Sequence, residues 1–175
     1  MKKLRGGGAL PPKPKFIQLM KGLVGGFFGI LTLGALSQLT DSPWLMAPFG
    51  ATCVILFAAP ASPLAQPRNV IIGHLVTSAV GLIALYGFGD SIIVMSLAVG
   101  VAIMLMQYLR VVHPPAGANP LVIILTGQGV VGFDYLFMPV LIGSVVLVVI
   151  ASVVNNYGED GRWPVYWHGL SRRKE

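Results

Sequence analysis

The chain alternates six apolar runs with short polar or proline-rich connections. The runs cover residues 22–39, 44–59, 70–88, 91–109, 115–131 and 135–154. Each approaches the roughly 20 residues (range about 17–25) that a helix needs to cross a bilayer. The second and fifth runs are short and carry prolines, so they are broken or re-entrant if they do not cross. The pattern predicts an all-α polytopic membrane bundle.

Four regions follow from the same pattern. Residues 1–21 form a basic, glycine- and proline-rich tail that is too polar to build a core, and we expect it to be disordered or interfacial. Residues 22–88 and 89–154 each contain three apolar runs and form two membrane repeats. Residues 155–175 form an aromatic and basic tail. The first run after the basic tail also permits a signal peptide, although the tail is long and broken by prolines.

Composition excludes the soluble classes of protein. Of the 175 residues, 55% are hydrophobic and 10% are charged, whereas a soluble domain carries roughly 25% charged residues. Mean hydropathy is +0.78. The single cysteine, Cys53, lies in an apolar run and supports neither a disulfide nor a cysteine-based metal site. A soluble enzyme, a disordered chain and a disulfide-stapled secreted domain are all excluded.

The placement of charge predicts an orientation. If all six runs cross and the basic tail is cytoplasmic, every lysine and arginine is cytoplasmic, including Arg68 and Arg110. The three outside loops then hold Asp41, Asp90 and Asp134. Four crossings would move both arginines outside, so the positive-inside rule favours six. We therefore expect a multi-pass protein of the inner (plasma) membrane with both termini cytoplasmic. The basic charges flank apolar spans, so nucleic acid is not an expected partner.

A weak internal repeat relates the two halves. Pro48-Phe49-Gly50-Ala51-Thr52 matches Pro115-Ala116-Gly117-Ala118-Asn119 at an offset of 67 residues, and the apolar runs align at the same offset. Three crossings per repeat is an odd number, which gives the inverted topology of many channels and transporters. We expect the two proline-marked segments to meet inside the bilayer beside a polar lane. The alternative is that Pro, Gly and Ala only allow tight helix packing.

His113-Pro114-Pro115 is the sharpest chemical feature. A histidine beside two prolines cannot lie in mid-helix, so His113 precedes the fifth span. Imidazole titrates near pH 6.5, about neutral, and can exchange a proton or pair with an anion. The alternative is an interfacial histidine bonded to a neighbouring carbonyl.

Other residues are candidates for the same substrate pathway. His74 lies inside the third span, where an ionisable group is a functional candidate by default. The polar and glycine positions of the repeat and two basic residues complete the set, which comprises Gly50, Thr52, Arg68, Asn69, Arg110, Gly117 and Asn119. Pro48, Pro114 and Pro115 are expected to be structural. For the histidine the alternative is a helix–helix hydrogen bond, and for the arginines it is orientation signalling alone.

Several segments together resemble the HPP family of integral membrane proteins, which takes its name from the His-Pro-Pro motif. They are residues 47–51, 62–69, 73–74 and 113–118. The resemblance covers roughly residues 20 to 157. The family is usually described with four transmembrane segments, fewer than the six runs counted here. Plastid and cyanobacterial members are associated with nitrite transport, so the resemblance implies transport of nitrite or another small anion. It implies no catalytic residues.

These observations predict a membrane channel or transporter for a small monovalent anion, with nitrite as the leading candidate. The expected partners are the lipid bilayer, the anion and further copies of the chain in a homo-oligomer. No cofactor or metal is expected. An enzyme is disfavoured because the spans contain no carboxylate pair and the chain lacks an H-E-x-x-H motif. The alternative function is a membrane scaffold or assembly subunit that transports nothing.

Overall fold

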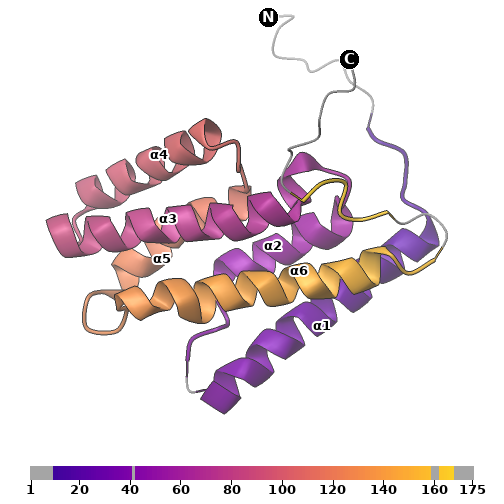
Figure 1. Ribbon diagram of the computed structural model, residues 1–175, viewed down its shortest axis with the longest axis horizontal. Helices are drawn as coiled ribbons and strands as arrows, with labels where there is room; N and C mark the ends of the chain where they lie inside the picture. The colour runs from indigo at the N-terminus through magenta and orange to yellow at the C-terminus, as the bar shows by residue number, and fades with distance from the viewer. Residues whose placement is uncertain (1–9, 41, 159–161, 168–175) are drawn as a thin grey trace, which may run out of the picture.

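In a computed structural model the chain is an all-helical bundle, as predicted (Figure 1). The structure describes residues 10–40, 42–158 and 162–167. The elements are α1 (Phe16–Thr40), α2 (Ala47–Ala58), η2 (Pro63–Ala65), α3 (Pro67–Phe88), α4 (Ile92–Tyr108), η3 (Pro114–Ala118), α5 (Asn119–Thr126), η4 (Phe133–Leu136), η5 (Phe137–Leu141) and α6 (Ile142–Asn155). None of the described residues forms a strand.

Three segments are long and apolar enough to cross a membrane: Phe16–Thr40, Pro67–Phe88 and Phe133–Asn155. The first helix begins inside the predicted tail, six residues before the apolar run. Its start is fixed locally, because the Lys15 amide donates to Gln18 Oε1 at 3.1 Å and the Gln18 amide donates to the Lys15 carbonyl at 2.9 Å. Residues 10–15 of the predicted tail are exposed and not helical, and residues 1–9 lie outside the described residues.

The second and fifth runs form half-length helices. α2 has 12 residues and α5 has 8, which correspond to about 18 Å and 12 Å of helix. The hydrocarbon core of a bilayer is about 30 Å thick. The expectation of short or broken segments is confirmed, whereas the expectation that each run approaches a full helical span is wrong for these two. A proline in the first turn of each helix, Pro48 in α2 and Pro120 in α5, limits how far the helix extends toward its N-terminus. Gly127, with a positive φ of 86°, ends α5.

Hydrogen bonds define one end of the bundle, which we call the basic end. Lys21 Nζ, near the start of α1, donates to the Asn155 carbonyl at the end of α6. The Asn155 amide donates to the Leu56 carbonyl near the end of α2. Arg68, at the start of α3, donates to the Leu109 carbonyl just beyond α4. The described lysines and arginines lie at or next to these helix termini: Lys13, Lys15, Lys21, Arg68, Arg110 and Arg162.

The opposite end holds the other connections. Gln128 Nε2, in the loop after α5, donates to the Leu85 carbonyl near the end of α3 at 2.8 Å. Tyr86 Oη donates to the Val131 carbonyl in the same loop at 2.9 Å. Asp90 and Asp134 lie in connections at this end. Successive α-helices run in alternate directions along the bundle (Figure 1). The half-length helices α2 and α5 follow this alternation although neither is long enough to cover the whole distance between the two ends.

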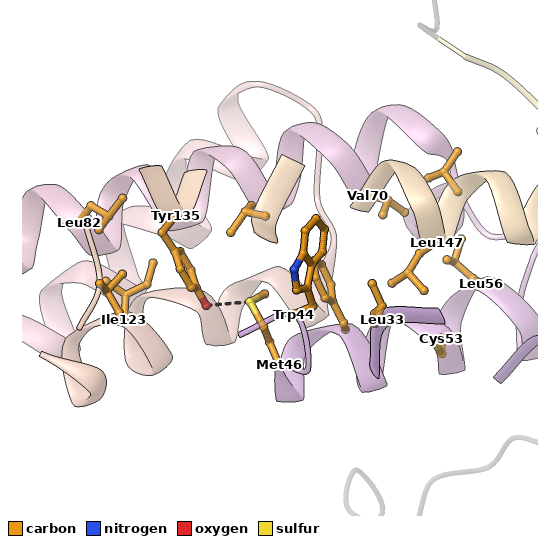
Figure 2. Packing of buried hydrophobic residues seen from close by; sticks show 14 of the residues in the cluster. Leu33, Trp44, Met46, Cys53, Leu56, Val70, Leu82, Ile123, Tyr135 and Leu147 are labelled. Atoms are coloured by element: carbon orange, nitrogen blue, oxygen red, sulfur yellow. Dashed lines mark hydrogen bonds between the residues drawn. The ribbon is translucent and has the colours of Figure 1, made fainter. Parts of the chain in front are cut away.

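The core between the helices is apolar. Side chains from α1, α2, α3 and α6 interdigitate along the bundle, with Leu33, Leu56 and Leu147 fully buried (Figure 2). Tyr135 Oη donates to Met46 Sδ at 2.7 Å. The close approach of α6 to α2 depends on Gly143, because a Cβ there would lie 2.5 Å from the Phe49 ring. The helices therefore pack tightly against one another around an apolar core.

Candidate functional site

Two histidines far apart in sequence meet inside the bundle. His74 lies two turns into α3, and His113 is the residue immediately before η3. Their ring centroids are 5.1 Å apart, and both side chains are 0% exposed. Prolines 114 and 115 prevent His113 from joining a helix, so the backbone is extended there and the imidazole is free to point inward.

Thr52 of α2 connects the two rings. Its hydroxyl oxygen lies 2.8 Å from His74 Nε2 and 2.9 Å from His113 Nε2. The hydroxyl also lies 3.0 Å from the Pro48 carbonyl one turn earlier. The other nitrogen of His113, Nδ1, lies 2.7 Å from the Leu64 carbonyl in η2. One hydroxyl thus bridges residues separated by 22 and 61 positions in the chain.

The contacts assign one tautomer to each neutral ring. The Leu64 carbonyl can only accept, so His113 carries its hydrogen on Nδ1 and accepts at Nε2. Thr52 can donate its one hydrogen either to the Pro48 carbonyl or to His113 Nε2, and we assign it to His113 Nε2, since two acceptors would otherwise face each other there. With its one hydrogen used, Thr52 accepts from His74 Nε2–H. The assignment follows from the hydrogen-bond network, and the resulting chain runs from His74 through Thr52 and His113 to Leu64.

Asn119 completes the chain at its other end. Its side-chain nitrogen lies 3.0 Å from His74 Nδ1, the nitrogen that this tautomer leaves as an acceptor. The same nitrogen lies 3.2 Å from the His74 carbonyl and 3.0 Å from Thr77 Oγ1. These acceptors fix the orientation of the amide, because the carbonyl oxygen of Asn119 would repel that of His74. Thr52 and Asn119, the matched positions of the sequence repeat, therefore bind opposite nitrogens of one imidazole.

Gly73 and Phe49 also shape the site, although neither was a candidate from the sequence alone. A Cβ on Gly73 would lie 3.0 Å from His113 Cβ and 3.1 Å from the Val111 carbonyl. Only glycine therefore lets α3 approach the segment before η3 this closely. The Phe49 ring meets the His74 ring edge-on, with centroids 5.0 Å apart. The sequence signals were the Gly73-His74 pair and the position of Phe49 within the repeat motif.

Two predicted pathway residues instead hold the loops of the basic end. Asn69 is 4% exposed and donates to the Val112 carbonyl at 2.9 Å, while its oxygen accepts from Tyr166 Oη at 3.1 Å. Arg68 donates to the Leu109 carbonyl at 2.9 Å. Both contacts tie the start of α3 to the segment that leads into His113. These side chains support the site from outside and do not join the chain of hydrogen bonds.

The remaining pathway candidates lie apart from that chain. Arg110 is exposed and has a φ of 57°. Gly50 and Gly117 are half-buried, and a Cβ on either would meet nothing within 4 Å. Close approaches between segments occur instead at other glycines, such as Gly73, Gly81 and Gly143.

The three prolines that we expected to be structural stand at helix starts. Pro48 occupies the first turn of α2, and Pro114 and Pro115 open η3. Proline suits the first helical turn, because the amide hydrogen that it lacks has no partner there.

The site is closed to solvent. His74, His113 and Thr52 are 0% exposed and Asn119 is 2% exposed. The predicted polar lane is not open in this conformation. Asn119 Oδ1 is buried with no hydrogen-bond partner among the described residues. The closed chain is electrically neutral in the assigned tautomers, and all four ring nitrogens are hydrogen-bonded.

No cluster of three or more His, Cys, Asp or Glu side chains occurs within the part of the chain that the structure describes. The two imidazoles face a hydroxyl and an amide rather than further metal ligands.

Comparisons with known proteins assign the chain to a family. The family model "HPP, transmembrane region" matches residues 11–164. Two proteins of Dictyostelium discoideum, both described as transmembrane proteins, are 35% and 36% identical over 95% and 90% of this chain. The chain covers 56% and 58% of those relatives' own lengths, and no solved structure matches it. This membrane protein, with its His-Pro-Pro segment at the buried site, therefore belongs to the HPP transmembrane family.

Proposed function

We propose that the protein carries a small monovalent anion, with nitrite as the leading candidate, across the membrane together with a proton. The observation that carries the proposal is the buried chain of Asn119, His74, Thr52 and His113 between the two halves of the bundle. Ionisable side chains inside a membrane protein are costly and mark substrate or proton routes. The residues of the chain come from α2, α3, the His113 segment and α5, so movement of any one element breaks it.

The polarity of the network favours a proton as the second solute. In the neutral tautomers every ring hydrogen is already donated, so a bare anion finds no imidazole donor. A proton arriving at His74 binds Nδ1, which leaves two donors, this N–H and the Asn119 side-chain amide, facing each other. A proton arriving at His113 binds Nε2, and Thr52 accepts it only by turning its own hydrogen to the Pro48 carbonyl at 3.0 Å. Protonation of His74 therefore breaks its hydrogen bond to Asn119, and the imidazolium becomes a cationic donor for the anion. Proton and anion together carry no net charge through the closed apolar core.

Closure also favours a carrier over an open channel. Both imidazoles are buried, and the surrounding core is apolar. A solute can reach the rings only if the helices move. We therefore propose alternating access, in which protonation of His74 releases the hydrogen bond that joins α3 to Asn119 at the start of α5.

An inverted repeat would supply such a motion, and we propose that residues 22–88 and 89–154 are its two halves. Exchanging α1, α2 and α3 with α4, α5 and α6 leaves the list of packed helix pairs unchanged. The α1–α2 pair corresponds to α4–α5, α1–α6 to α3–α4, and α2–α6 to α3–α5, while α3–α6 corresponds to itself. Rocking of one half against the other is the usual mechanism in transporters of this design.

Orientation follows from charge. The described basic residues gather at one end of the bundle, and the positive-inside rule assigns such an end to the cytoplasm. We propose a multi-pass protein of the plasma membrane with both termini cytoplasmic, assembling as a homo-oligomer. It has no enzymatic role and no nucleic-acid partner in this proposal.

Nitrite uptake into proteoliposomes tests the proposal. We expect uptake that exceeds that of protein-free liposomes and rises when the outer pH is lowered from about 8 to about 6, because the lower outer pH supplies the protons that enter with the anion. Protein-free vesicles at each pH correct for the permeation of nitrous acid. A pH indicator inside the vesicles should report acidification of the lumen in step with nitrite entry. Uptake equal to that of empty vesicles at every pH would end the transport proposal.

One observation favours a second function, a membrane scaffold. The site is dry, closed and almost fully hydrogen-bonded, which also suits a purely structural knot between helices. Nitrite flux through the Thr52→Val variant distinguishes a carrier from a scaffold. Thr52→Val would destabilise both a carrier and a scaffold, whereas only a carrier would lose nitrite flux at temperatures where the variant remains folded.

A further inference from the structure

A large cavity lies at the basic end, away from the histidines. It has a volume of about 640 Å³ and is lined by the start of α1, the end of α2, the end of α6 and the C-terminal segment around Trp163. This volume lies within the range of small-molecule sites, about 300–1,000 Å³. None of the residues that form the histidine chain lines it.

The charged side chains in the described lining are both cationic. Lys21 extends from α1 and Arg162 from the C-terminal segment, and none of the described residues that line the cavity is acidic. Lys21 Nζ donates to the Asn155 carbonyl at 2.9 Å. An ammonium group carries three hydrogens, so Lys21 retains capacity for a further acceptor. Two cations beside one cavity at the end of a membrane bundle favour an anionic occupant.

Trp163 adds an unpaired donor to the lining. The residue is 5% exposed, and its Nε1 hydrogen has no partner among the described residues. The backbone of Trp163 is held firmly, because its amide and carbonyl both bond to the Asn156 side chain, at 2.8 and 2.6 Å. Leaving a buried donor unpaired is costly. The oxygen of a bound anion is the acceptor that this indole lacks.

An apolar groove continues from the cavity along the bundle. It has a volume of about 310 Å³ and runs between α1 and α6, lined by aliphatic residues such as Met20, Val24 and Val153. Ile17, Lys21 and Tyr157 line both the cavity and the groove. A largely apolar cavity that carries two cationic side chains thus adjoins a fully aliphatic and aromatic groove at Lys21. An inorganic anion would fill only the first space, whereas an amphiphile fills both.

We propose that this is a binding site for an anionic phospholipid, with the phosphate headgroup between Lys21 and Arg162 and one acyl chain along the groove between α1 and α6. Lys21 spans the boundary, with its methylene stem against the groove and its ammonium at the phosphate. The lipid would join α1 to α6 and to the C-terminal segment, which itself bonds to the loop beneath the histidines through Val165 N and Gln66 Oε1 at 2.8 Å. Its occupancy therefore stabilises the basic end.

Thermal unfolding of the full chain in detergent tests the site. Phosphatidylglycerol should raise the unfolding temperature saturably, while phosphatidylcholine and inorganic phosphate at equal concentration should not. Stabilisation by inorganic phosphate alone would assign the cavity to a free anion and overturn the lipid proposal. Equal stabilisation by both lipids would reduce the effect to general solubilisation and would also overturn it.

Variants locate the binding. Lys21→Gln and Arg162→Gln should each weaken the apparent affinity for phosphatidylglycerol about fivefold, since one basic contact to an anionic lipid is lost. Lys13→Gln is the matched control, because Lys13 is exposed at the same end and lines neither space. Trp163→Phe keeps an aromatic ring but removes the indole N–H, and should weaken the phospholipid effect with little change in the lipid-free protein. Equal losses in Lys13→Gln and Lys21→Gln would show diffuse surface attraction and end the proposal.

Discussion

The two halves of the molecule share their helix packing but not their chemistry. Thr52 of the first half and Asn119 of the second stand at matched positions and bind opposite nitrogens of His74. The histidines themselves have no counterparts, because the position matched to His74 is Leu141 and the one matched to His113 is Met46. The comparison teaches that two halves whose helices pack in corresponding pairs can contribute different polar groups to one site.

The half-length helices differ in the same way. In the first half a single proline in the opening turn allows 12 residues of α-helix. In the second half His113-Pro114-Pro115 and Pro120 divide the matched segment into a 3₁₀ turn and an α-helix of 8 residues. The additional prolines hold the backbone extended at His113, which lets its ring reach Thr52. The first half supplies the Thr52 hydroxyl that bridges the rings, and the second half supplies the imidazole of His113, which lies outside any helix.

Replacing His74 by leucine, the residue matched to it in the second half, should have the largest effect. Thr52 loses its donor and Asn119 loses an acceptor on the ring, so we expect a loss of about 2–4 kcal/mol in unfolding free energy. Nitrite uptake should fall to the level of empty vesicles. Chemical unfolding in detergent and proteoliposome flux measure the two effects. Leu141→Met is the control and should change little; an unaltered His74→Leu protein would remove the central role of this ring.

His113→Met copies the matched residue of the first half and should rank second. The variant loses the bonds to Leu64 and Thr52, about 1–3 kcal/mol. Any residual uptake should rise less as the outer pH falls, since one of the two rings that can take up the proton is gone. Flux at about pH 6 and pH 8 provides the measurement. His113→Met with the pH dependence of the parent protein would move the proton site to His74 alone.

Gly73→Ala tests the close approach beneath the site. Its Cβ would lie 3.0 Å from His113 Cβ and 3.1 Å from a backbone oxygen, so α3 must shift, at a cost of about 1–3 kcal/mol. Gly117→Ala is the matched control, because a Cβ there meets nothing within 4 Å. The thermal unfolding temperatures of the two variants should therefore separate. Equal values would mean that the segment before η3 is not packed against α3.

Thr52→Val keeps the shape of the side chain but removes the bridging hydroxyl. We expect a loss of about 1 kcal/mol, with reduced uptake, because both imidazoles lose one partner. Thr52→Ser retains the hydroxyl and should restore most of the uptake. If serine performs no better than valine, packing by the methyl group and not the bridge is the function of Thr52.

Variants of Arg68 and Arg110 should show the smallest difference in unfolding free energy. Arg68→Gln removes the bond to the Leu109 carbonyl and should cost about 0.5–1 kcal/mol, whereas exposed Arg110→Gln should leave the unfolding free energy unchanged. Unfolding of both variants in detergent makes the comparison. A larger loss in Arg110→Gln would assign it a partner that the structure does not contain.

Much of the site could be predicted as a set of residues but not as an arrangement. Proline beside His113 and the placement of His74 in an apolar span marked both rings as candidates, and the repeat marked Thr52 and Asn119. Nothing in the local sequence indicated that one hydroxyl would serve both rings, or that Arg68 and Asn69 would brace loops instead. These facts depend on contacts across 22 to 61 residues of chain.

The sequence by itself determined that this is a helical membrane protein of the HPP family, with two proline-shortened helices and its described basic charges at one end. Hydropathy, proline and charge act locally, so their consequences can be followed along the chain. Only the tertiary structure decided that the histidines meet, that the site is closed, and that Gly73 rather than Gly50 or Gly117 permits the contact. Those outcomes depend on which helix faces pack together, and single-chain periodicity does not specify the pairing of faces.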